Sequence, residues 1–175
     1  ARSLVPELPE EVRDLLRELD VAGKRSGGLL AAAGTLPAGT TENVRLSVLS
    51  ILLRACGLPT QYPQAQFHLW LEERGLLAKV KGAVEAAGKT WMQELNNLYV
   101  SPLIAKALLA ADPNFATSEA AVRELIKAQF PLRTADLTTE EFLAMFQRVL
   151  RRAGKDGQLP CTLLVLDETQ QYIGD

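Results

Sequence analysis

The sequence predicts a mainly helical protein that carries a minimal two-stranded parallel β element. Apolar residues recur at helical spacing over most of the 175 residues. Only two short segments, residues 29–33 and 161–166, have the uninterrupted apolar character of buried strands. Hydrophobic residues make up 47% of the chain and charged residues 23%, which is typical of a globular protein and excludes a disordered one.

The charge balance and the cysteines limit where the protein works. There are 19 Lys and Arg residues against 21 Asp and Glu, a net charge of −2, which does not favour nucleic acid or an anionic membrane as the main partner. No apolar run is long enough to span a membrane, and no signal peptide opens the chain. Cys56 and Cys161 lie far apart and fit buried thiols better than a disulfide. We therefore expect a cytoplasmic location and no membrane partner.

Helix start and stop signals divide the chain into elements. A first helix is expected from Pro9 to Gly23, and a second, apolar on nearly all sides and therefore buried, from its N-cap Thr41 to Cys56. From residue 63 to 146 the pattern is helical with clear breaks. N-cap residues are expected at three further positions, namely Ser101, Ser118 and Thr138.

The domain organisation predicted is one fragment domain over residues 1–175. Within it, residues 26–41 form a strand and turn, 60–157 a helical insertion, and 158–175 a strand and the segment after it. The final strand is apolar without alternation, which is typical of a central strand covered on both faces. Its backbone needs neighbours, and the chain offers at most one. We therefore expect a piece of a longer protein, whose unpaired strand pairs with its own copy in a homodimer.

The most specific motif is Leu163–Glu168, in which four aliphatic residues precede Asp and Glu. This is the Walker B pattern of P-loop ATPases, in which a parallel strand presents an aspartate at its carboxyl end. Asp167 would hold Mg²⁺ of a bound Mg²⁺–ATP through water, and Glu168 would orient or deprotonate the attacking water. The alternative interpretation is a buried strand that ends in a solvated acidic turn.

A phosphate-binding loop should accompany a Walker B strand. Gly34–Thr41 is a near match to GxxxxGK[ST], but Thr40 occupies the lysine position. A plain turn with Thr41 as N-cap explains the same residues. We expect the functional loop to lie before Ala1.

The remaining candidates favour structural roles. His68 is the only histidine, which excludes a multi-histidine metal site and a Ser-His-Asp triad. Cys56 and Cys161 are expected in the core, as are Trp70 and Trp91. A basic cluster near a helix C-terminus is expected to complement the helix dipole; it comprises Arg148, Arg151, Arg152 and Lys155.

Four segments together resemble the large P-loop ATPases of bacteriophage-exclusion (BREX) defence systems, the BrxC/PglY-like proteins. The segments are residues 31–39, 88–91, 94–102 and 162–175. The resemblance implies that the chain is the stretch of a P-loop α/β ATPase domain that ends at Walker B. It implies that Asp167 is the magnesium-associated aspartate and Glu168 the catalytic glutamate, whereas no residue matches the P-loop lysine.

The same resemblance implies partners and cofactors. ATP and Mg²⁺ would bind the parent protein, and neither would bind tightly to this chain, which would be inactive alone. The partners would be other defence-system proteins, and DNA through their complex. Two alternatives are a non-enzymatic helical protein-interaction module, and a small self-contained ATPase that uses the loop of residues 34–41.

Overall fold

The protein is mainly helical, with a two-stranded parallel sheet, as predicted. The computed structural model describes residues 9–37, 43–133 and 135–169. Those residues form eight helices and two strands. They divide into two compact units, residues 1–56 with 137–175, and residues 57–136. We call these the strand unit and the helical unit.

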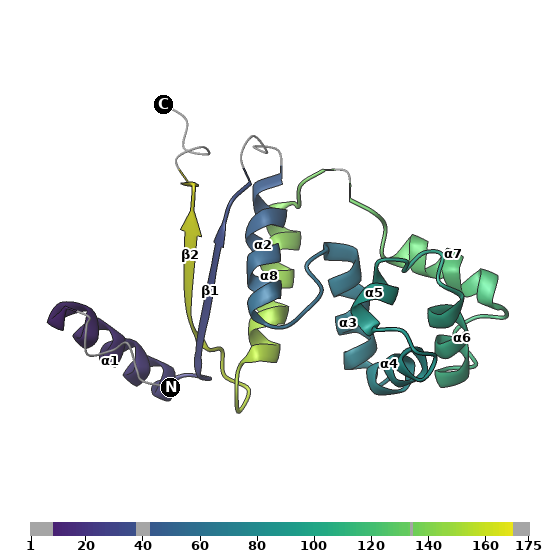
Figure 1. The fold of residues 1–175 in the computed structure, drawn as a ribbon, viewed down its shortest axis with the longest axis horizontal. Helices are drawn as coiled ribbons and strands as arrows, with labels where there is room; N and C mark the ends of the chain where they lie inside the picture. The colour runs from purple at the N-terminus through teal and green to yellow at the C-terminus, as the bar shows by residue number, and fades with distance from the viewer. Residues whose placement is uncertain (1–8, 38–42, 134, 170–175) are drawn as a thin grey trace. The chain divides into compact units, whose positions relative to one another are not determined.

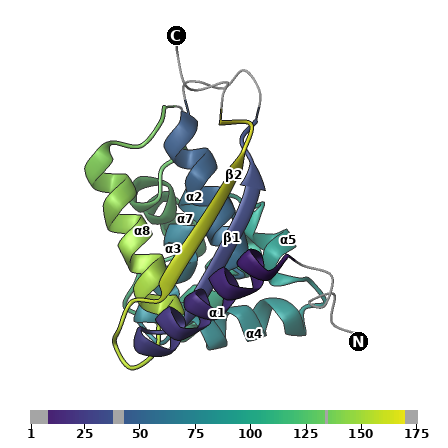
Figure 2. The same cartoon turned by 90° about the vertical axis from the view of Figure 1, so that its left-hand side faces the viewer.

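The strand unit is built from three helices and both strands (Figure 1). Its elements in chain order are α1 (Glu10–Arg25), β1 (Leu29–Thr35), α2 (Val44–Ala55), α8 (Thr139–Ala153) and β2 (Cys161–Asp167). Helices α2 and α8 pack together on one side of the strands, and α1 crosses the other side near the strands' amino ends (Figure 2). The unit therefore has three layers, with the sheet in the middle.

The two strands pair in parallel over their whole length. Leu29 lies opposite Cys161, and Thr35 lies opposite Asp167. Backbone hydrogen bonds continue to both ends of the strands. The Cys161 amide donates to the Gly28 carbonyl at 2.8 Å, and the Leu36 amide donates to the Asp167 carbonyl at 3.1 Å. The carboxyl ends of both strands therefore meet at one edge of the unit.

The inner face of the sheet packs tightly against α2. Ala32 and Leu36 on this face are buried. A Cβ atom at Gly34 would lie 2.7 Å from Cγ1 of Ile51, so only glycine lets α2 approach this closely. The buried residues of α2 are Leu49, Ile51, Leu52 and Leu53, as expected for a helix that is apolar on nearly all sides.

The outer face of the sheet differs from the prediction. We expected β2 to be covered on both faces, but Leu163 is 40% exposed and Val165 52%. Only the amino end of this face has a cover, where Gly23 of α1 approaches Leu29 closely. The sequence pattern correctly indicated that both faces of β2 are apolar. Among the described residues, however, only the inner face is packed along most of the strand.

The helical unit forms a separate core from five helices. These are α3 (Tyr62–Glu73), α4 (Leu77–Ala86), α5 (Trp91–Leu95), α6 (Pro102–Ala111) and α7 (Glu119–Gln129). Phe67 lies at its centre and contacts the rings of Trp70, Trp91 and Phe130. Trp70 is only half-buried, so the prediction of a core position holds for Trp91 and only in part for Trp70.

The predicted helix caps are present wherever the structure describes them. Ser101 accepts from the Ile104 amide, Ser118 accepts from the Ala121 amide, and Thr138 forms a complete capping box with Glu141. The predicted cap Thr41 lies outside the described residues. Within the described part of the chain, every helix is too short or too polar to cross a bilayer.

Candidate functional site

The candidate site lies at the carboxyl ends of the two parallel strands. Asp167 is the last residue of β2 and is exposed. The backbone next to Asp167 is fixed, because its carbonyl accepts from Leu36 and its Cα pairs with Thr35. Parallel strands with helical connections bind ligands at this end of a sheet. The strand therefore holds the Asp167 carboxylate at the edge where open parallel sheets commonly bind ligands.

Glu168 follows with an unusual backbone conformation. Its φ angle is +61°, in the left-handed region that residues other than glycine rarely adopt. The Glu168 amide donates to Oδ1 of Asp167 at 2.9 Å, which supports the turn locally. Non-glycine residues in this region carry backbone strain and are frequent at functional sites. No feature of the sequence predicted this conformation.

The near match to a phosphate-binding loop is described only in part. Gly34 and Leu36 belong to β1 and its end, where glycine is required by the contact with Ile51. The second half of the motif, Gly39–Thr41, lies outside the described residues. The packing of α2 against the sheet thus gives Gly34 a structural role that needs no phosphate.

The described residues contain no group of three His, Cys, Asp or Glu side chains that could hold a metal ion. Asp167 therefore offers one carboxylate ligand at this edge, and the Thr35 hydroxyl group is on the residue opposite. Mg²⁺ is commonly bound in this way, with one or two protein carboxylates and the rest of its shell from water and phosphate oxygens. The donor set fits a magnesium nucleotide and does not fit a protein-only metal centre.

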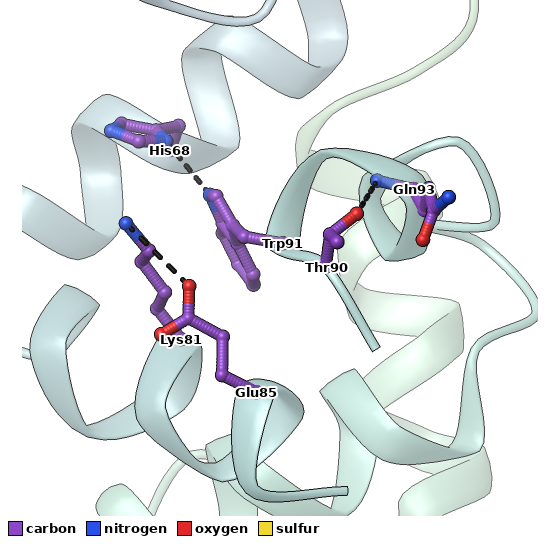
Figure 3. A network of polar contacts seen from close by, with 6 residues as sticks. All are labelled: His68, Lys81, Glu85, Thr90, Trp91 and Gln93. Carbon is purple, nitrogen blue, oxygen red and sulfur yellow. Dashed lines mark hydrogen bonds and ion pairs between the residues drawn. The ribbon is translucent and has the colours of Figure 1, made fainter. Parts of the chain in front are cut away.

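His68 has a structural role in the helical unit. The Trp91 indole N–H donates to Nδ1 of His68 at 3.0 Å, and both side chains are buried (Figure 3). The ring is thereby fixed with Nδ1 as an acceptor. Next to it, Lys81 and Glu85 form an ion pair at 3.7 Å along α4, and Thr90 caps α5 by accepting from the Gln93 amide. The bond between Trp91 and His68 joins α3 to α5.

Both cysteines are half-buried and free, where full burial was expected. Burial raises the pKa of the Cys56 thiol, and the Arg152 guanidinium lowers it by less. Arg152 of the basic cluster therefore lies near the C-terminus of α2 as well as in the last turn of α8. This agrees with a role at helix ends.

Sequence reasoning missed a second buried polar pair besides that of Trp91 and His68. The Ser101 hydroxyl donates to Oε1 of Glu94, and both residues are at least nine-tenths buried. The same hydroxyl accepts from the Ile104 amide at the start of α6. Ser101 was identified as a cap, but no pattern indicated that Glu94 would be its buried partner. The pair joins α5 to the start of α6.

Comparison with known proteins identifies no relative: no family model, no curated protein and no solved structure matches this chain.

Proposed function

We propose that this chain contributes the Walker B strand to a cytoplasmic P-loop ATPase of the kind found in BREX phage-defence systems. One observation carries the proposal: β2 runs parallel to β1 and ends at Asp167–Glu168, on the edge where such sheets bind nucleotides. The family, its defence-protein partners and its link to DNA rest on the resemblance of four sequence segments alone.

The two carboxylates would have different tasks. Asp167 is exposed and would hold Mg²⁺ through water, while Glu168 would orient the attacking water. When bound, ATP would supply the electrophilic phosphorus, and Mg²⁺ would neutralise negative charge on the phosphate oxygens. The backbone supports this division, because Asp167 is the last residue of β2 whereas Glu168 leaves the strand conformation with a positive φ.

The test is ATP turnover by the longer protein that the proposal implies. Glu168→Gln should lower turnover by roughly 10²–10⁴-fold, the usual contribution of a positioned acid–base group, with nucleotide binding retained. Glu140→Gln, at the exposed first turn of α8, is the matched control and should leave turnover unchanged. Unchanged turnover in Glu168→Gln would refute the proposal.

The 175-residue chain gives a second test. Without a phosphate-binding lysine, it should show no micromolar affinity for ATP in calorimetry. Binding that appears only in Thr40→Lys would favour the alternative of a small self-contained ATPase. Micromolar binding by the unmodified chain would contradict the proposal that a loop elsewhere supplies this contact.

One observation favours the alternative of an interaction module. In the helical unit, Leu132 is 69% exposed and Val100 68%, and Leu132 lines an open cavity of about 210 Å³ beside Tyr99. A scaffold of this kind should tolerate alanine at both Asp167 and Glu168 in the longer protein. An ATPase should not.

A further inference from the structure

The outer edge of β2 has the features of a strand that pairs with another chain. In a strand, the N–H and C=O groups of alternate residues point to opposite sides. Cys161 and Asp167 bond to the β1 side, so the backbone groups of Thr162, Leu164 and Leu166 point to the other side. No described element pairs with them there. Along this edge β2 has no lysine, proline or bulge, the devices that usually prevent edge pairing.

We propose that two copies of this chain associate through β2, antiparallel and centred on Leu164, to form a continuous four-stranded sheet. The inference does not depend on the ATPase assignment. In this register Leu164 exchanges both backbone bonds with its own copy, and Thr162 pairs with Leu166 of the copy. Between them, Leu163 faces Val165 of the copy in a close, non-hydrogen-bonded pair. Two side chains that are exposed in one chain thus cover each other.

The charge distribution selects a second copy in the antiparallel orientation. The amino end of the sheet carries the cations Arg25, in the last turn of α1, and Lys155, which is held to Gly27 through its backbone, while Lys24 is already paired with Asp20. The carboxyl end carries Asp167 and Glu168. An antiparallel copy places its acidic end at this basic end, whereas a parallel one would place both aspartates side by side.

Sedimentation or light scattering across a concentration series tests the association. The full 175-residue chain should dimerise, and Val165→Lys should raise the dimer dissociation constant by at least about tenfold, because it places a charge on the edge. Met92→Lys, on an exposed methionine of the helical unit, is the matched control and should leave it unchanged. Circular dichroism verifies that both variants fold. A monomer at all concentrations, or a dimer that Val165→Lys leaves intact, would overturn the proposal.

Disulfide trapping tests the register and remains informative if the lysine variant unfolds. In a Cys56→Ser, Cys161→Ser background, chains with Leu163→Cys are mixed with chains with Val165→Cys. Their Cα atoms would be about 4.5 Å apart across the dimer, within the range for a disulfide. The mixture should therefore cross-link at least about tenfold faster than either variant alone. Equal rates in all three samples would contradict the register.

Discussion

The two units of this protein treat their apolar surface differently. In the helical unit, helices surround Phe67 and leave it with no exposed surface. In the strand unit, α2 covers one face of the sheet, while Leu163 and Val165 on the other face stay exposed. The helical unit is therefore a closed core, whereas the strand unit has an open sheet. The nucleotide site that we propose lies at the end of β2 in the open unit, and the dimer contact lies along the edge of the same strand.

The largest difference in unfolding free energy is expected when one large apolar side chain in each unit is shortened to alanine. Phe67→Ala should lower the free energy of unfolding of the helical unit by about 3–5 kcal/mol, because it leaves a cavity among packed rings. Leu163→Ala should cost the strand unit about 1 kcal/mol or less, since its side chain is already partly in water. Urea unfolding followed by tryptophan fluorescence and circular dichroism measures both. Similar costs would contradict the contrast.

The buried pair of Ser101 and Glu94 allows a buried helix cap to be compared with an exposed one. Ser101→Ala should cost about 2–3 kcal/mol, because it removes a helix cap and leaves the buried Glu94 carboxylate without its donor. Ser118→Ala removes a cap of the same kind from an exposed site and should cost only about 1 kcal/mol. Equal losses in thermal or urea unfolding would show that Glu94 contributes nothing through Ser101.

The closed face of the sheet should behave like a core. Gly34→Ala should cost about 1–2 kcal/mol, because the added methyl group would meet the Ile51 side chain. Ile51→Val removes a methyl group at the contact and should recover part of that loss in a double-mutant cycle of unfolding free energies. Additive effects would mean that the two residues do not clash.

The smallest effect is expected at the candidate site. Glu168→Gly should raise the free energy of unfolding by up to about 1 kcal/mol, because glycine adopts a positive φ without strain. Asp156→Gly, at another left-handed position, is the matched control and should have the same sign. A higher thermal stability of Glu168→Gly would indicate that glutamate at this position lowers the stability of the fold. A loss larger than about 1 kcal/mol would contradict the presence of strain.

Local chemistry explains which features the sequence predicted. The caps at Ser101, Ser118 and Thr138, and the strand at residues 161–166, depend on neighbours within a few positions. The parallel pairing was also predicted, and the long helical connection between the two strands makes it possible.

Features that depend on distant contacts were not predictable. Periodicity indicated that β2 is apolar on both faces, but it could not indicate that one face would remain open. The bond between Trp91 and His68 joins residues 23 positions apart and leaves no local pattern. The left-handed turn at Glu168 has no glycine or asparagine to mark it.

Residue-resolved amide hydrogen exchange along β2 tests the central claim most directly, namely that this strand is paired on one side and open on the other. At a concentration low enough to keep the chain monomeric, the amides of Leu163 and Val165 should exchange slowly, because they bond toward β1. Those of Thr162, Leu164 and Leu166 should exchange fast and become protected as the concentration rises. Uniform protection of all five amides in the monomer, or uniform fast exchange, would contradict the account.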